Sequence, residues 1–350
     1  MIRLLYTLAV LDGQALQNVT QYIDRMDIIA PQCYELCEGE ISGGSDPKLI
    51  KIIDAHNENR PKNKHVKVMP LIVNKDFNQE GFHEFLYDPE KIKSVIDQIV
   101  KLCQEHNYYG IQFDFEHILV SDKEKYTDFC RAAAKALHDK GYEFSVAIVG
   151  RLYDEEYYKN PNADKYQVWV FENWSGVYDQ KELGEISDFV SIMTYDQHTR
   201  NTTPGPIAGL PWVEQLVSVA LKSISPEKLS LGIPFYSGLW FPSVDPNDQN
   251  NTVLLRKGLN YDEVKALVSS KAIKLIWDDT NKVYHGYFEE NFVNKYLFVE
   301  ERDSLEAKLN IIKDGGLHGF SAWRIGFEDM RFYDLLDSVV LSDNSIGQEN

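Results

Sequence analysis

Short runs of β-branched and aromatic residues alternate with longer amphipathic stretches along most of this 350-residue chain. Strands that alternate with helices form βα units, and the strands of such units pair in parallel. Eight such strands with intervening helices predict an α/β protein with a (β/α)₈ TIM barrel. A doubly wound open sheet is the alternative. The candidate strands are Ile2–Leu11, Asp27–Tyr34, Val66–Val73, Gly110–Glu116, Tyr142–Val149, Asp188–Asp196, Leu229–Tyr236 and Gly319–Ile325.

The helices predicted between these strands have recognisable ends and one apolar face. Pro89–His106 follows Asp88, a residue type that caps helix N-termini. Asp122–Lys140 has the same design and ends before Gly141, which is typical of a helix stop. The first of these helices places one apolar stripe on its surface, made of Ile92, Val95, Ile96, Ile99, Val100 and Cys103.

The chain is about 100 residues longer than a typical barrel of about 250 residues. Much of the surplus lies between the seventh and eighth strands, from Gly238 to His318. This interval contains a predicted helix, two strands and the next barrel helix, at Tyr261–Lys271, Ile273–Trp277, Val283–Phe288 and Ser304–Lys313. We therefore expect a barrel at residues 1–238 and 299–342, a small α+β insertion between strand seven and helix seven at residues 239–298, and a C-terminal tail at residues 343–350.

The net charge of the chain restricts the classes of partner that it can bind. It carries 54 acidic and 36 basic residues, a formal net charge of −18 at pH 7. A phosphate backbone or an anionic bilayer repels such a surface, so we expect neither a nucleic acid nor a membrane as partner. No run approaches the roughly 20 apolar residues of a membrane span, and Met1–Val10 fits a core strand better than a signal peptide. We expect a soluble monomer and leave its compartment open.

The cysteines do not have the paired short spacings of a zinc site. We therefore expect no metal centre and four buried free thiols. They are Cys33, Cys37, Cys103 and Cys130.

The most informative local pattern is Tyr109-Gly110-Ile111-Gln112-Phe113-Asp114-Phe115-Glu116. Alternate side chains of a strand share a face, so Gln112, Asp114 and Glu116 point one way and the apolar residues point the other. The polar row then faces the barrel interior, with Glu116 at the rim where barrel enzymes hold their sites. Confinement raises the pKa of a carboxyl group, as a general acid requires near neutral pH. A strand end with ordinary salt bridges is the alternative.

Two further strand ends carry candidate residues. Ser191-Ile192-Met193-Thr194-Tyr195-Asp196 closes the sixth strand with a phenol and a carboxylate, for which a capping role and a functional role are equally supported. Trp323 lies on the eighth strand, where core packing alone explains it.

Together these motifs resemble glycoside hydrolase family 18, the chitinase family. The family's patterns are D-G-x-D-x-D-x-E on strand four, M-x-Y-D on strand six, glycine-isoleucine-proline on strand seven and a tryptophan on strand eight. The resemblance covers nearly the whole chain, including the insertion. The matching residues are Gly110, Asp114 and Glu116, then Met193, Tyr195 and Asp196, then Gly232-Ile233-Pro234, and finally Trp323.

The resemblance implies retaining hydrolysis with the substrate's own acetamido group as nucleophile, a mechanism that needs no metal or other cofactor. It implies that Glu116 is the general acid and base, and that Asp114 holds the acetamido N–H. Tyr195 would donate to the acetamido oxygen and Asp196 would fix this arrangement. Trp323 would form the floor under the sugar ring.

The remaining candidate positions contact substrate in this interpretation, or stack on sugars. Met193, Gln112 and Tyr236 are expected to contact substrate, while Tyr236, Trp174, Trp212 and Trp240 are candidates either for sugar stacking or for packing. Two residues depart from the signature: Tyr109 replaces its first Asp and Gln112 its second. Within the family, the sequence most resembles the spore-cortex N-acetylglucosaminidases and related chitinase-domain proteins. An amide in place of the second carboxylate is common in the spore-cortex relatives, so Gln112 does not imply an inactive protein. The pH optimum of typical chitinases does not transfer to it.

The expected substrate contains N-acetylglucosamine, in chitin oligomers, peptidoglycan or an N-glycan core. The charge of −18 disfavours strongly anionic wall polymers and so tilts the expectation towards chitin-like substrates. A catalytically silent glycan-binding protein and an unrelated barrel enzyme are the other interpretations. Retention of Glu116 favours an enzyme over the silent protein.

Overall fold

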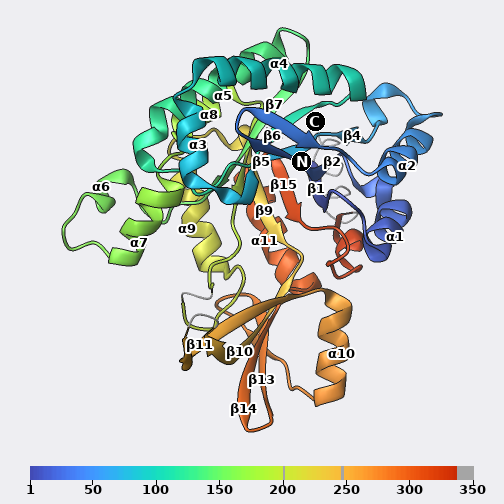
Figure 1. Ribbon diagram of the computed structural model, residues 1–350. Coiled ribbons are helices and arrows are strands. Elements are labelled where there is room, and N and C mark those ends of the chain that lie inside the picture. The colour runs from blue at the N-terminus through green and yellow to red at the C-terminus, as the bar shows by residue number, and fades with distance from the viewer. Residues whose placement is uncertain (200–201, 246–247, 337–350) are drawn as a thin grey trace, which may run out of the picture. The chain divides into compact units, whose positions relative to one another are not determined.

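The computed structural model describes residues 1–199, 202–245 and 248–336 (Figure 1). The predicted tail at residues 343–350 lies outside the described residues. Parallel strands form a closed barrel in the order β1-β15-β9-β8-β7-β6-β5-β2, and β1 also pairs with β2. The predicted TIM barrel is therefore confirmed, and the open sheet is wrong. The barrel strands are β1 (Ile2–Leu8), β2 (Ile28–Cys37), β5 (Leu71–Asn74), β6 (Gly110–Phe113), β7 (Glu143–Val149), β8 (Phe189–Met193), β9 (Leu229–Pro234) and β15 (Gly319–Trp323).

Helices follow most of these strands, and two short strands extend the sheet beside β2. The short strands are β3 (Glu40–Gly43), antiparallel to β2, and β4 (Lys67–Val68), parallel to it. The helices outside the insertion are α1 (Gly13–Tyr22), α2 (Pro47–Asn57), α3 (Gln79–Leu86), α4 (Pro89–His106), α5 (Lys123–His138), α6 (Glu155–Tyr158), α7 (Lys165–Val170), α8 (Gln180–Ile186), α9 (Leu210–Ala220) and α11 (Arg302–Gly315).

Glycines start two of the barrel strands because neighbouring backbones leave no room for a side chain. A Cβ on Gly110 would lie 2.0 Å from the carbonyl oxygen of Glu143 on β7. A Cβ on Gly319 would lie 1.9 Å from the carbonyl oxygen of Ile2 on β1. The glycine of the strand-four pattern is thus required by the close approach of β6 and β7.

The chain divides into two compact units. The first comprises residues 1–193, 215–232 and 312–321, and the second residues 194–214, 233–311 and, among the described residues, 322–336. In the first unit, Phe113 and Phe115 are fully buried and point to the helix layer. Phe113 stacks on Phe129 of α5 with ring centroids 5.1 Å apart, and Phe115 packs on Phe82 of α3 at 4.8 Å. The outward face predicted for the apolar residues of this strand is confirmed.

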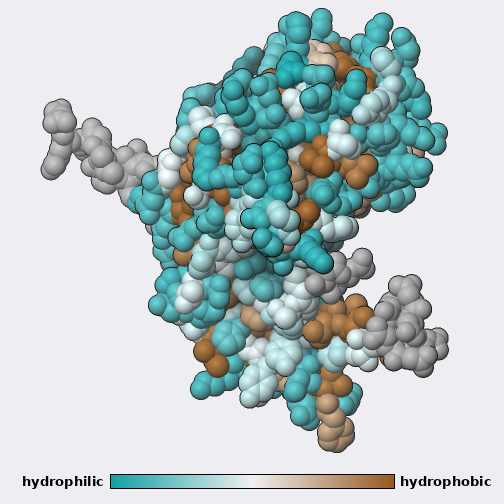
Figure 2. All heavy atoms as spheres, turned by 90° about the vertical axis from the view of Figure 1, so that its left-hand side faces the viewer, coloured by the Kyte–Doolittle hydropathy of each residue, from teal (hydrophilic) through white to brown (hydrophobic). Residues whose placement is uncertain are grey.

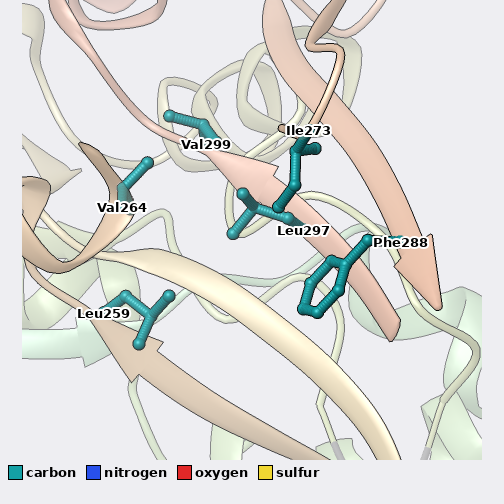
Figure 3. Close-up of a cluster of buried hydrophobic side chains, with 6 residues drawn as sticks. All are labelled: Leu259, Val264, Ile273, Phe288, Leu297 and Val299. Carbon is teal, nitrogen blue, oxygen red and sulfur yellow. The ribbon is translucent and has the colours of Figure 1, made fainter. Parts of the chain in front are cut away.

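The second unit contains an antiparallel sheet and one helix, α10 (Tyr261–Lys271). Its helix has the predicted bounds, but only two of its strands were expected. A compact apolar cluster joins the helix to one sheet face: Leu259, Val264, Ile273, Phe288, Leu297 and Val299 (Figure 3). The strands, in sheet order, are β11 (Asp248–Leu259), β10 (Ser237–Asp245), β14 (Val293–Val299), β13 (Val283–Glu290) and β12 (Ile276–Asp278).

The surface seen in Figure 2 is mainly hydrophilic, with small apolar patches between the polar side chains. Among the described residues, no helix is long and apolar enough to cross a membrane. The four cysteines are free thiols, and Cys33, Cys103 and Cys130 are buried as predicted. Cys37 is exposed, so the prediction is wrong for this residue, which ends β2 where the chain turns into the β3 hairpin.

We expect Gly110→Ala to lower the free energy of unfolding by about 2–3 kcal/mol, because overpacking against rigid backbone is relieved only by moving a strand. Gly13→Ala is the matched control, since a Cβ at that position meets nothing within 4 Å. Denaturant unfolding of both variants measures the difference. Equal stability of the two variants would contradict the close-approach explanation.

Candidate active site

The backbone of Glu116 is fixed by a side chain of the neighbouring strand. Asn74, the last residue of β5, donates from Nδ2 to the carbonyl oxygen of Glu116 at 2.9 Å and accepts from the Glu116 N–H at 3.0 Å. Asn74 is itself buried. The Asn74 amide therefore provides the backbone hydrogen bonds that a paired strand would otherwise make to Glu116, which lies beyond the end of β6. These two bonds fix the position from which the Glu116 side chain projects.

The Glu116 carboxylate accepts a hydrogen bond from Trp174. The indole Nε1 lies 2.9 Å from Glu116 Oε2. Trp174 belongs to the π-helical turn Phe171–Ser175, which follows α7 in the long segment between β7 and α8. Its ring stacks on His117 with centroids 4.4 Å apart and an angle of 15° between the planes. Sequence reasoning offered Trp174 as an aromatic for sugar stacking or for packing and missed this contact, for which no sequence signal exists.

Asp114 is enclosed on the interior side of the same segment. It is 6% exposed, and its backbone N–H still donates to Ile72 of β5. Its Oδ1 has no hydrogen-bond partner among the residues that the structure describes. Burial raises the pKa of Asp114 to about 7, because the charged form loses its hydration. A substantial fraction of this carboxyl group is therefore protonated near neutral pH.

Gln112, one strand period earlier, lies in a neutral hydrogen-bonded layer inside the barrel. Its Oε1 accepts from Tyr6 at 2.8 Å, and its Nε2 donates to Ser145 at 2.8 Å and to Ser191 at 3.1 Å. The layer continues through Ser321, whose hydroxyl is 2.7 Å from those of both Ser191 and Ser230. Both donors and the acceptor of the Gln112 amide are engaged. Gln112 is thus a structural member of the interior, and it is fully buried.

Asp196, in the second unit, is held by two partners. Tyr236 donates its hydroxyl to Asp196 Oδ1 at 2.6 Å, and the guanidinium of Arg256 lies 2.6 Å from the same oxygen. Tyr195 packs edge-on against Tyr236 with ring centroids 6.3 Å apart. Arg256 comes from β11, a strand without a sequence motif, and sequence reasoning missed it.

The other predicted residues have simpler surroundings. Met193 ends β8 and is half-buried. Trp323 is also half-buried, and its carbonyl oxygen accepts from the N–H of Phe235 at 2.7 Å. Trp212 is half-buried, whereas Trp240 is fully buried, so packing is the correct alternative for Trp240.

The structure thus assembles the candidates in two groups. Within the first unit, the segment at the end of β6 brings Gln112, Asp114 and Glu116 together. Within the second, Tyr195, Asp196 and Tyr236 are neighbours. Among the described residues, no group of three or more His, Cys, Asp or Glu side chains is placed to hold a metal ion.

The raised pKa of Asp114 has a consequence for stability. Between the unfolded pKa of about 3.9 and the folded value of about 7, the native state binds more protons than the unfolded state, so this group's contribution to stability falls as pH rises. We expect the unfolding free energy of Asp114→Asn, relative to wild type, to rise by up to about 1.4 kcal/mol per pH unit across this window. Denaturant unfolding at several pH values tests this. A difference independent of pH would show that the folded pKa is not raised.

Comparison with known proteins identifies the family. The profile of Glycosyl hydrolases family 18 matches residues 22–328. The uncharacterized glycosylase YvbX of Bacillus subtilis is 25% identical over 329 residues, which are 92% of this chain and 87% of that protein. The cortical fragment-lytic enzyme of Bacillus anthracis is 27% identical over 261 residues, covering 74% of this chain. The chain spans only 56% of that relative's length.

Solved structures show the same fold. The spore cortex-lytic enzyme SleL of Bacillus megaterium QM B1551 superposes with a TM-score of 0.79 at 21% identity, covering 96% of this chain and 73% of that one. A chitinase of Chromobacterium violaceum ATCC 12472 gives 0.80 at 20% identity, covering 97% of this chain and 99% of that one. With the family profile spanning most of the barrel, the chain belongs to glycoside hydrolase family 18 and is a glycosidase.

Proposed function

We propose that the protein is a retaining glycoside hydrolase that cleaves β-1,4 linkages next to N-acetylglucosamine by substrate-assisted catalysis. The observation that carries this proposal is the pair at the end of β6. Glu116 is held by Asn74 and Trp174, and Asp114 lies two residues before it in a buried site. Both residues occupy acidic positions of the family pattern. Enzymes of this family use one acid and, in place of a second carboxylate nucleophile, the acetamido group of the substrate.

In the first step, Glu116 protonates the glycosidic oxygen while the acetamido carbonyl oxygen attacks the anomeric carbon. The bond to the leaving sugar breaks, and an oxazolinium ion forms. In the second step, the Glu116 carboxylate takes a proton from the water that attacks the anomeric carbon, and the ring opens to restore the acetamido group. Glu116 is thereby protonated again, and the configuration is retained.

Asp114 suits the role of holding the acetamido N–H and stabilising the positive intermediate. Burial raises its pKa to about 7 in the free enzyme, so part of the population starts neutral. A positive charge nearby favours the carboxylate form and lowers this pKa again. The oxazolinium ion therefore favours the charged form of Asp114, and the attraction of that carboxylate is strongest for the intermediate and the transition states that flank it.

The other proposed roles rest on the register of the family motifs. Tyr195 would donate to the acetamido oxygen, and Trp323 would support the distorted ring. Asp196, paired with Tyr236 and Arg256, would keep a fixed orientation. Met193 would line the sugar site, whereas the fully engaged amide of Gln112 supports an indirect role behind Asp114.

The substrate class is any glycan with an acetamido group next to the cleaved bond. Chitin oligomers are therefore one test substrate, and cortical fragments, after which the Bacillus anthracis relative is named, are the other. The acidic surface favours a neutral chain over a strongly anionic one. A silent glycan-binding protein is the outcome if none of these substrates is cleaved while saccharide binding is intact.

We expect Glu116→Gln to reduce hydrolysis of a fluorogenic chitobioside or of cortical fragments by about 100- to 10,000-fold, because the amide cannot donate or accept the transferred proton. Initial rates at substrate saturation measure the loss. Glu124→Gln, the same substitution at an exposed position of α5, is the control and should keep full activity. Wild-type rates in Glu116→Gln would remove the proposed general acid.

We also expect a matched glucoside, with a hydroxyl where the substrate carries its acetamido group, to remain uncleaved, because no internal nucleophile is then available. Competition assays establish whether the glucoside binds, and turnover is followed by release of the same fluorophore. Cleavage of the glucoside at a rate similar to that of the acetamido substrate would point to an enzyme nucleophile instead.

A further inference from the structure

Trp174 is held in place by contacts on its ring face as well as by its hydrogen bond. The indole stacks on His117, the residue next to Glu116, at 4.4 Å. His117 in turn packs edge-on against Phe77, with ring centroids 5.9 Å apart. The backbone of His117 has φ +55°, in the left-handed region that few residues other than glycine adopt. This turn at the end of the β6 segment thus directs the imidazole onto the indole.

The backbone of Trp174 is equally constrained. The N–H of Gly176 donates to the carbonyl oxygen of Phe171 at 2.8 Å, which closes a π-helical turn around Trp174. A Cβ on Gly176 would lie 2.4 Å from that oxygen, so the tight turn requires glycine. Gln79 also donates to the carbonyl oxygen of Asn173 at 3.3 Å. Single π turns inside helices are frequent at functional sites.

We propose that Trp174 is a positioning residue for Glu116, which selects the oxygen that carries the transferred proton and stabilises the carboxylate left behind. This proposal rests on the proposed function of Glu116. An indole N–H can only donate, so the oxygen it contacts, Oε2, must act as acceptor. The carbonyl oxygen of a carboxylic acid accepts hydrogen bonds better than its hydroxyl oxygen, so this contact favours the acid form that carries its proton on Oε1. The indole thus presents the acid in one orientation.

The contribution of Trp174 grows as the reaction proceeds. When Glu116 gives its proton to the glycosidic oxygen, negative charge develops on the carboxylate, and hydrogen bonds to charged acceptors are stronger than those to neutral ones. The N–H therefore stabilises the transition state more than the bound substrate. Loss of such an interaction lowers kcat and leaves KM nearly unchanged.

Trp174→Phe removes the N–H and keeps an aromatic ring for the stack on His117. We expect kcat to fall about 10- to 100-fold, the range of a hydrogen bond to a charged group, with KM within about twofold. The basic limb of the pH profile should move to higher pH, because the carboxylate loses a stabilising donor. Three titratable groups that the described contacts place around this site, Asp114, His117 and Tyr178, are the same in both enzymes. Trp169→Phe, an exposed position of the preceding helix α7, is the control and should match wild type.

A measurement on the wild-type protein keeps the test independent of how well the variant folds. Among the indole ¹⁵N–¹H signals of the six tryptophans, one should titrate with Glu116, and Glu116→Gln should abolish that titration. Wild-type kcat and pH profile in Trp174→Phe, or an indole signal set that ignores Glu116, would overturn the positioning role. Full activity of Glu116→Gln would instead overturn the proposed function itself, so the two failures are distinguishable.

Discussion

A neutral hydrogen-bonded layer inside the barrel determines the environment of Asp114, the acidic residue that follows Gln112 on the same face of the segment. Gln112 joins Tyr6 of β1 to Ser145 of β7 and Ser191 of β8, and Ser321 extends the layer to Ser230 of β9. Buried polar groups are costly unless they are paired, and here the donors and the acceptor of the Gln112 amide are all used. The Gln112 amide consequently offers Asp114 neither a spare proton nor a compensating charge.

The strand period then separates three polar side chains into three different environments. Gln112 is neutral and satisfied, Asp114 is buried with one oxygen that no described residue contacts by a hydrogen bond, and Glu116 lies beyond the strand end with its backbone held by Asn74. Each step of two residues therefore gives a side chain with a different state. Gln112 is a structural amide, Asp114 is an acid whose pKa is raised by burial, and Glu116 is a carboxylate that accepts a hydrogen bond. An Asp at position 112 would place a second titratable group below Asp114, whereas the amide leaves Asp114 to respond mainly to its burial and to charge that develops above it.

Local signals allowed good prediction of some elements and failed for others. Pro89–His106 and Tyr261–Lys271 have their predicted bounds because caps and apolar periodicity are encoded within the helix itself. The fourth strand was predicted to Glu116 but ends at Phe113, since the strand's end depends on its neighbours as well as on its own residues. The contact of Trp174 with Glu116 joins positions 58 residues apart, and Arg256 reaches Asp196 from a strand that has no motif. Such contacts require the fold to be known.

In the proposed mechanism Glu116 both gives and takes a proton, and a carboxyl group with these two tasks needs a hydrogen-bond partner that shifts its pKa only moderately. A cationic donor such as arginine would favour the carboxylate strongly and lower its pKa out of the range useful for an acid at neutral pH. An apolar surrounding would raise the pKa and leave the charged form unstable in the second step. The indole N–H of Trp174 is neutral and donates one hydrogen bond, so in the proposed mechanism it would stabilise the carboxylate and still allow the proton to return. A neutral donor is therefore well suited to a reaction in which the same residue is acid in one half and base in the other.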